Sequence, residues 1–319
     1  MGRASRTKHD DDRRHRIAAQ RAAARRARLR NRLLLAGGAI VAVIAVTVAV
    51  VLVNTGSQNP PAAPPPGGLT GTALAATVRE VTTVPGSVLD AVGGGNLVTT
   101  DIGSPTAVGS GYLTPVSGSP LTSGGKPEVL YVGADFCPYC AAARWPLIVA
   151  LSRFGTFSGL TTTTSAVKDG AGQAELYPAT PTWTFSGARY TSDYLTFTSV
   201  ETNTNVPDPS TGFYTVLQAP TAAEQTTLAA YDPSGGIPFV DVGNKYVQLT
   251  TLVPYGPQDL QGKTWSQITA ALRDPSSVLG GEIDASANYL TAAICTITGN
   301  RPASACTPAV RALQSRLGH

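Results

Sequence analysis

The apolar positions of the chain form one long unbroken run followed by many short ones. Residues 33–53 read LLLAGGAIVAVIAVTVAVVLV and contain no charged side chain. At about 1.5 Å per residue, a helix of this length spans roughly 30 Å, the thickness of one hydrocarbon core. A cleaved signal peptide is the alternative, but its apolar run is about 7–15 residues and ends at a small-x-small site, which VVLVNTGS does not offer. The run therefore predicts a retained transmembrane helix.

After this run, strand-like and helix-like patterns alternate. Short apolar or β-branched runs predict strands at residues 128–133, 194–201, 238–243 and 245–250, the last two forming a hairpin that turns at Gly243–Asn244. Helical composition predicts helices at residues 138–154, 221–231, 265–273, 283–298 and 308–317, with a kink at Pro146. Residues 71–125, rich in Gly, Thr, Ser and Pro, suggest short strands and turns. Strands alternating with helices indicate an α/β layered domain.

The charges are divided unevenly along the chain. Residues 1–32 hold half of the 24 Lys and Arg residues and only three acids, whereas the part after residue 53 carries more acids than bases. Basic residues crowd one side of the apolar run, so the positive-inside bias places the N-terminus in the cytoplasm and the body outside. The basic tail is expected to form a helix on anionic lipid, with a nucleic-acid-binding arm as the alternative. The acidic body argues against a large nucleic-acid surface.

These patterns set the expected domain boundaries. Residues 54–69 are rich in proline, which favours an extended, semi-rigid stalk. We expect a basic cytoplasmic tail (1–32), a transmembrane helix (33–53), a linker (54–69) and an extracytoplasmic domain (70–319). The chain is thus predicted to be a single-pass protein of the cell membrane.

The body has almost no histidine, since the three histidines of the chain lie at positions 9, 15 and 319. This removes Ser–His–Asp and Cys–His catalysis and histidine-ligated zinc from consideration. The candidate chemistry therefore rests on cysteines, whose even number suits pairing in an oxidising compartment. They are Cys137, Cys140, Cys295 and Cys306.

The first cysteine pair stands where a strand runs into a helix, in GADFCPYCAAARW. The helix N-terminus supplies free N–H groups and partial positive charge, which stabilise a thiolate at Cys137. A lowered pKa makes this sulfur the attacking group, and Cys140, one turn later, resolves the mixed disulfide. Pro138 fits the first turn, where its missing N–H is no loss. An inert bridge or half of a zinc site is the alternative. The absence of histidine and the spacing of Cys295 and Cys306 argue against zinc, and the motif, its strand-to-helix context and the oxidising compartment together favour a redox pair.

The second pair, Cys295 and Cys306, encloses the loop TITGNRPASA between two expected helices. A structural disulfide that staples the C-terminal hairpin is the first interpretation. A second redox pair that relays electrons to Cys140 is the alternative, although its spacing lacks the helix-start geometry of the first pair.

The CPYC motif after a hydrophobic strand resembles the active site of the thioredoxin superfamily, and its Pro-Tyr pair is typical of dithiol glutaredoxins. Ile237–Pro238 before FVDVGNKYVQ resembles the cis-proline loop of that superfamily. From about residue 125 to 306 the chain is most similar to membrane-tethered proteins of the domain-of-unknown-function family 929, through GKPEVLYVGADFCPYCAAARW, YPATPTWTF and ANYLTAAICTITGNRPASAC. The resemblance implies a thioredoxin-like fold with an insertion between the dithiol helix and the proline hairpin. It also implies substrate contacts from Pro138, Tyr139, Ile237 and Pro238.

Three positions depart from the pattern of that superfamily. Many relatives carry a buried carboxylate six residues before the first cysteine, where this chain has Tyr131. Asp135 is the nearest acid and could accept the proton instead, with a solvated loop acid as the simpler interpretation. Arg144 falls on the helix face of Cys137, two turns away, where a surface role is favoured over thiolate stabilisation. Because no histidine lies between the cysteines, we expect the reduction potential of this pair to be intermediate rather than strongly oxidising.

Two X–Pro bonds compete for the place beside the dithiol. Thr180–Pro181 precedes the strand-like run TWTF, and Ile237–Pro238 precedes the expected hairpin. A cis proline of this superfamily should open an antiparallel hairpin that leads into a closing helix. This favours Pro238 as the cis residue that faces the cysteines.

The expected function is thiol–disulfide exchange with protein thiols or disulfides of the cell envelope. No organic cofactor or metal is implied, but a redox partner in the membrane or envelope is required to reset the dithiol. The rival is a non-catalytic binding module on the same scaffold, in which both cysteine pairs are static bridges.

Overall fold

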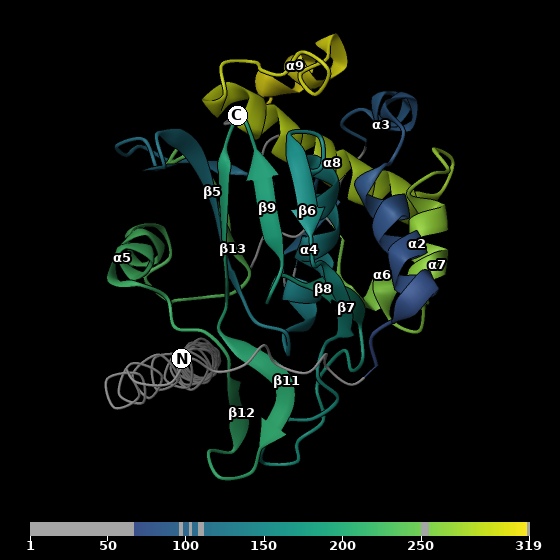
Figure 1. Cartoon of the computed structure of the whole chain (residues 1–319), viewed down its shortest axis with the longest axis vertical. Coiled ribbons are helices and arrows are strands. Elements are labelled where there is room, and N and C mark those ends of the chain that lie inside the picture. The colour runs from purple at the N-terminus through teal and green to yellow at the C-terminus, as the bar shows by residue number, and fades with distance from the viewer. Residues whose placement is uncertain (1–66, 96–97, 102–103, 108–111, 250–254, 318–319) are drawn as a thin grey trace, which may run out of the picture. The chain divides into compact units, whose positions relative to one another are not determined.

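The structure, a computed structural model, describes residues 67–95, 98–101, 104–107, 112–249 and 255–317. These residues form eight helices and a central mixed sheet with smaller two-stranded ribbons (Figure 1). The expected α/β class is confirmed at this level. The expected cytoplasmic tail, the transmembrane helix and most of the linker lie outside the described residues. Within the described residues, no helix combines the length and hydropathy needed to cross a bilayer.

The central sheet joins a parallel pair to an antiparallel flank. β5 (Lys126–Gly133) lies parallel to β10 (Thr196–Glu201) on one side and antiparallel to β13 (Phe239–Val242) on the other. The order continues antiparallel through β14 (Tyr246–Gln248) to β3 (Thr114–Pro115), while β4 (Thr122–Ser123) pairs with the start of β5. The last five residues of β5 are buried, as in a strand covered on both faces.

The expected hairpin is formed by β13 and β14. At its turn, Gly243 and Asn244 have φ of 69° and 55°, a left-handed conformation that these two residue types adopt at low cost. The Asp241 carboxylate accepts a hydrogen bond from the Asn244 N–H at 2.7 Å, which holds the turn from inside.

Helix α4 (Pro138–Leu151) is buried along its whole length except at Tyr139. It contacts β8 (Pro181–Thr184) on one side and the long helix α8 (Val278–Ile297) on another. Pro146 lies inside the helix, as the sequence predicts, and cannot donate a backbone hydrogen bond to Ala142. The Tyr255 hydroxyl donates to the Ala142 carbonyl instead, so this buried acceptor has a partner.

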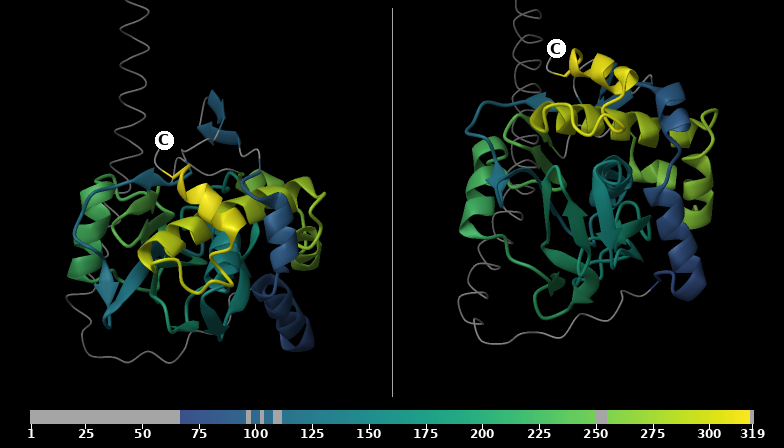
Figure 2. Two further views of the ribbon diagram at one scale, coloured as in Figure 1. Left: turned by 90° about the horizontal axis from the view of Figure 1, so that it is seen from above. Right: turned by 45° about the horizontal axis from the view of Figure 1, so that its top comes forward.

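The expectation of short strands and turns is wrong for the first part of residues 71–125. Gly71–Thr82 forms α2 and Gly86–Val92 forms α3. Leu74, Val78 and Val81 recur at helical spacing and face the core, and this stripe decides the local structure despite the glycines and threonines around it. α2 lies beside α7 (Trp265–Ala271), as both views of the ribbon show (Figures 1 and 2). Further along, β1 (Val98–Asp101) pairs with β2 (Ser104–Ala107).

The chain between α4 and β13 forms a series of short strands and one helix. β6 (Gly155–Ser158) pairs with β9 (Arg189–Ser192), and β7 (Thr161–Thr164) pairs with β8. After β10 follows a hairpin of β11 (Asn203–Asp208) and β12 (Phe213–Val216). α5 (Ala222–Tyr231) then begins at the expected place, where Thr221 and Glu224 form a reciprocal capping box.

The C-terminal part is helical, as expected. It consists of α6 (Pro257–Leu260), α7, α8 and α9 (Pro308–Gln314). α8 is the central helix of this layer, because it packs against α4, α7, α9 and α3 (Figure 2). α8 and α6 of this layer, together with α2, thus pack against α4.

Candidate active site

The CPYC motif lies where the sequence predicts, between the end of β5 and the start of α4. Cys137 is the N-cap residue of α4, with φ −76° and ψ 121°, and its sulfur accepts a hydrogen bond from the Cys140 N–H at 3.3 Å. Cys137 is 6% exposed and Cys140 is fully buried. Both are free thiols in this structure. Cys137 is therefore the more accessible of the two thiols, and Cys140 lies behind it.

The two thiols have opposite pKa shifts. Burial alone would raise the pKa of Cys137, but hydrogen bonds from the Cys140 thiol and backbone N–H, with the charge of Arg144, bring it below its ordinary value. Burial raises the pKa of Cys140 well above its ordinary value, and the neighbouring Cys137 adds to this. Such a pair has one sulfur prepared to attack and one kept protonated until needed.

The loop before β13 adjoins the dithiol. The Ile237–Pro238 peptide bond is cis, as the sequence predicts, and the Cys137 thiol donates to the Ile237 carbonyl oxygen at 3.9 Å. Ile237 is half-buried, whereas Pro238 is buried. Pro181, the competing proline, instead accepts a hydrogen bond from the Trp145 indole at 3.1 Å through its carbonyl, at the start of β8.

The expected surface role of Arg144 is wrong. Its guanidinium is fully buried and forms two hydrogen bonds with the carboxylate of Glu201, at 2.9 and 2.6 Å. A second acid, Asp135, lies 3.6 Å from the same guanidinium, and the Arg144 side chain lies 5.7 Å from the ring centre of Tyr131. We call Asp135, Arg144 and Glu201 the buried triad.

Glu201 was missed at the level of sequence. It closes β10, directly opposite Gly133 at the end of β5, so the parallel pairing brings it to the same edge of the sheet as the dithiol. An acid at the end of the run YLTFTSVE is the only signal in the sequence, and it reads equally well as a solvated strand end. The pairing with β5, which decides its burial, is not visible in the sequence.

Asp135 is not a solvated loop acid, since it is 2% exposed. Burial raises the pKa of Asp135 to about 7, the charge of Glu201 adds to the rise, and Arg144 opposes it. Tyr131, six residues before Cys137, is also buried. Its hydroxyl has no hydrogen-bond partner among the described groups. Asp135 thus stands as a buried group that can change protonation near neutral pH.

Aromatic side chains surround the exposed edge of the dithiol. The Phe136 ring stacks on Tyr214 at 4.3 Å between ring centres and meets Phe213 edge-on at 5.1 Å. Tyr139 meets Tyr177 edge-on at 6.1 Å. Of the residues expected to contact substrate, Tyr139 and Ile237 are half-buried, while Pro138 and Pro238 are buried. Among the described residues, no group of three or more His, Cys, Asp or Glu side chains is arranged to hold a metal ion.

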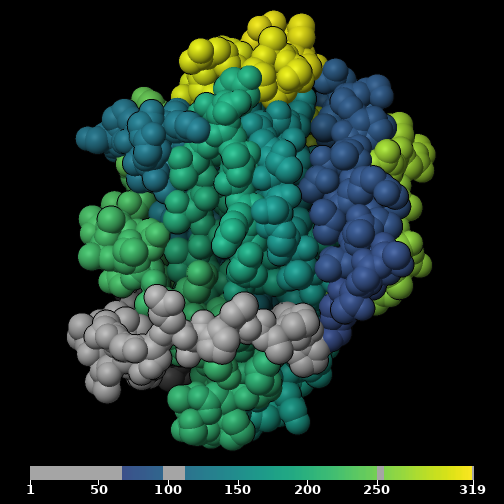
Figure 3. All heavy atoms as spheres, in the orientation of Figure 1, coloured from purple at the N-terminus to yellow at the C-terminus, as the bar shows by residue number. Residues whose placement is uncertain are grey.

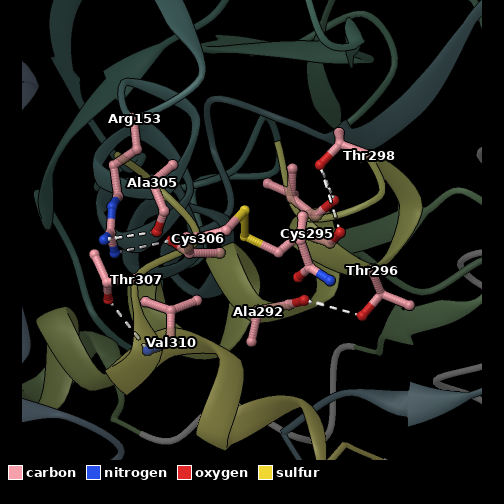
Figure 4. The surroundings of a disulfide bond; sticks show 12 residues. Arg153, Ala292, Cys295, Thr296, Thr298, Ala305, Cys306, Thr307 and Val310 are labelled. Carbon is pink, nitrogen blue, oxygen red and sulfur yellow. Dashed lines mark hydrogen bonds between the residues drawn. A yellow bond between two sulfur atoms is a disulfide. The ribbon is translucent and has the colours of Figure 1, made fainter. Parts of the chain in front are cut away.

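Cys295 and Cys306 form a disulfide, the pairing that the sequence predicts (Figure 4). Both are buried, and the bond joins the last turn of α8 to the start of the chain that enters α9. Arg153, just after α4, donates to the Ala305 carbonyl at 2.9 Å (Figure 4). It also donates to the Asn288 side chain at 3.0 Å. The bridge thus belongs to a hydrogen-bonded corner between α4, α8 and α9.

Replacing Cys295 and Cys306 together with serine is expected to lower the free energy of unfolding by about 3 kcal/mol, because a short loop is no longer closed in the unfolded chain. Chemical denaturation of the variant and the parent chain measures the difference. Thiol exchange by the folded fraction should stay unchanged. Lost exchange with unaltered stability would favour the electron-relay interpretation instead.

A family model matches part of the chain. No protein of curated function and no solved structure matches the chain. The stretch that the family model matches includes β5, both cysteines of the CPYC motif, all of α4 and Glu201. It includes neither Pro238 nor the C-terminal disulfide. Over residues 112–208, the chain matches the model of a family described as a domain of unknown function, DUF929.

Proposed function

We propose that this protein carries out thiol–disulfide exchange through Cys137 and Cys140. The observation that carries the proposal is the asymmetry of the pair. The Cys137 sulfur caps a helix N-terminus, is 6% exposed, accepts a backbone N–H and has a lowered pKa, whereas the Cys140 sulfur is fully buried one turn behind it and has a raised pKa. A static bridge needs none of these features.

The strand order supports a thioredoxin-like architecture for this centre. In that architecture the strand before the dithiol has a parallel neighbour on one side and an antiparallel hairpin on the other, and the dithiol opens the first crossover helix. The order β10–β5–β13–β14, with α4 after β5 and α8 as the closing helix, agrees with this description. The segment from β6 to β9 is then an insertion.

The proposed reaction proceeds in two exchanges. The Cys137 thiolate attacks a substrate disulfide, whose S–S bond breaks as a Cys137–substrate disulfide forms and the released thiolate takes up a proton. Cys140 then loses its proton, for which Asp135 is the candidate acceptor, and attacks the Cys137 sulfur. This releases the second substrate thiol and leaves a Cys137–Cys140 disulfide. Two electrons pass to the substrate, and the same steps reversed oxidise a substrate dithiol.

The alkylation rate of each cysteine with iodoacetamide, followed against pH in the reduced protein and located by mass spectrometry, tests this proposal. Cys137 should react with a midpoint below about 8.5, the ordinary thiol value, while Cys140 stays protected. Equal reactivity at both positions would favour the rival, a non-catalytic binding module with static bridges.

The Cys140→Ser variant adds a direct chemical test. Because the resolving thiol is lost, substrates should accumulate as mixed disulfides on Cys137, seen as reductant-sensitive bands on a non-reducing gel. The variant Cys137→Ser, Cys140→Ser is the matched control and should trap nothing.

We further propose that the exchange takes place outside the cytoplasm, at the cell membrane. The support is the charge-free run 33–53, which has basic residues crowded on its N-terminal side and none after it until Arg79, an asymmetry that favours a body outside the cytoplasm. Envelope protein thiols or disulfides are then the substrates, and a redox partner of the membrane or envelope resets the dithiol. A membrane-impermeant thiol reagent, applied to intact cells after mild reduction, should label Cys137. Labelling only after lysis would refute this placement.

A further inference from the structure

Two segments outside the central sheet flank the turn between β5 and α4, where the dithiol lies. One is the loop 165–180, whose Ala166 N–H donates to the Phe136 carbonyl at 3.0 Å. The other is the hairpin 203–216, where the Asn203 carbonyl accepts from the Asp135 N–H at 2.9 Å. We call these two segments the collar. Phe136, next to Cys137, stacks on Tyr214 of the hairpin, so the collar begins directly beside the attacking sulfur.

The two halves of the collar are fixed to each other. The Tyr214 hydroxyl donates to the Glu175 carboxylate, which ties the hairpin to the loop. Gly170 of the loop lies against the hairpin backbone, since a Cβ atom added there would come within 2.2 Å of the Asp208 carbonyl oxygen and 2.5 Å of that of Phe213. Side chains larger than hydrogen do not fit such a contact. The collar is therefore a preformed surface rather than two independent loops.

The collar carries most of the strongly exposed apolar side chains of the described residues. Five large hydrophobic residues are prominently exposed, and four of them are Val167 (58%), Leu176 (71%), Val206 (41%) and Val216 (39%). The fifth, Val278, lies at the start of α8. Single exposed apolar residues need no explanation, but their concentration on two joined segments next to a reactive sulfur indicates a binding surface. Figure 3 shows the hairpin end of the molecule in green and teal at the bottom of the face drawn.

The collar is also acidic. It contains Asp169, Glu175 and Asp208 against one base, Lys168. A partner that covers apolar side chains here gains further from carrying positive charge. The apolar residues have no counterpart in a small polar disulfide, so such a substrate does not depend on them.

We propose, on the basis of the exchange reaction above, that the collar binds the substrate as an extended polypeptide segment in which apolar side chains and a basic residue flank the reacting cysteine. Cys137 is only 6% exposed and lies against the Ile237 carbonyl, so the substrate sulfur must come on a narrow segment of chain. The exposed valines and Leu176 contact the apolar side chains on either side of it. Unfolded or newly exported chains present such segments.

Exchange kinetics of the full-length chain with two substrates test this inference. The first substrate is a short unstructured peptide whose disulfide-bonded cysteine is flanked by leucines and an arginine. The second is glutathione disulfide. In the collar variant, Val167, Leu176, Val206 and Val216 are all replaced with serine. Val278→Ser is the control, since Val278 is also a strongly exposed apolar residue but lies outside the collar.

The collar variant should lose about tenfold in kcat/KM for the peptide, which corresponds to about 1.4 kcal/mol, and keep its rate with glutathione disulfide. Val278→Ser should leave both rates unchanged. Replacing the arginine of the peptide with glutamate should slow the parent chain, and added salt should reduce the difference. An unchanged peptide rate in the collar variant, or an equal loss with both substrates, would overturn the inference. If the parent chain exchanges with neither substrate, the proposed function itself fails.

Discussion

Replacing Arg144 with methionine is expected to lower the free energy of unfolding by about 3–5 kcal/mol, the cost of leaving a buried charge without its partner. In the parent chain the guanidinium holds the Glu201 carboxylate by two hydrogen bonds and lies 3.6 Å from Asp135. Without it, two acids remain side by side in the protein interior. Urea denaturation at neutral pH measures the loss.

The same change should also alter the reactivity of the dithiol. The positive charge of Arg144 lowers the pKa of Cys137, so its removal should move the alkylation profile of Cys137 to higher pH. A residue with a purely structural role would destabilise the fold without moving this profile. The thiol measurement therefore separates thiolate stabilisation from packing.

The matched control is the double variant Arg144→Met, Glu201→Leu. Replacing a buried ion pair with apolar residues costs less than removing one partner, because no unpaired charge is left. The remaining acid, Asp135, already has a pKa raised to about 7 and can be neutral. The double variant should therefore regain most of the stability lost by the single one. A single variant that loses less than about 1 kcal/mol, within the range of surface ion pairs, would contradict the burial of this pair.

Replacing Asp284 with asparagine is expected to stabilise the folded state at pH 8 and to remove part of its dependence on pH. Asp284 lies in α8, is fully buried, and neither of its carboxylate oxygens has a hydrogen-bond partner within the described part of the chain. Burial raises its pKa from 3.8 to about 8. At one pKa unit per 1.36 kcal/mol, this shift corresponds to a penalty on the order of 5 kcal/mol for the ionised form.

The sign of the pH dependence follows from proton binding. Between pH 4 and pH 8 the folded state holds the Asp284 proton and the unfolded state has lost it, so the free energy of unfolding falls as pH rises. Below the unfolded value of 3.8 this contribution is fully present, and above the folded value of about 8 it is gone. Asp284→Asn should flatten this slope in denaturation curves taken across the range.

The exposed acid Asp193 supplies the control for this measurement. Asp193→Asn removes the same charge from the surface and should leave the slope as in the parent chain. An Asp284→Asn variant with an unchanged slope would show that the folded state already ionises this side chain near its ordinary pKa.

The sequence alone determined the parts that depend on neighbours along the chain. The strand before CPYC, the helix that Cys137 opens, the Thr221 capping box and the turn at Gly243–Asn244 follow from local geometry, and all are present. The Cys295–Cys306 pairing was also within reach, because few partners were available. The prediction of short strands and turns was wrong for residues 71–92. There, the helical spacing of Leu74, Val78 and Val81 outweighs the helix-breaking tendency of the glycines and threonines.

Only the tertiary structure decided which polar groups are buried and which segments meet. Asp135 and Arg144 read as solvated residues because their positions along the chain do not reveal that β10 and its Glu201 lie beside them. The collar is equally invisible, since its two segments come from separate parts of the chain and are joined by Gly170, Glu175 and Tyr214. Burial and contact over long sequence separations depend on how strands and loops pack in space. Local sequence patterns do not encode that packing.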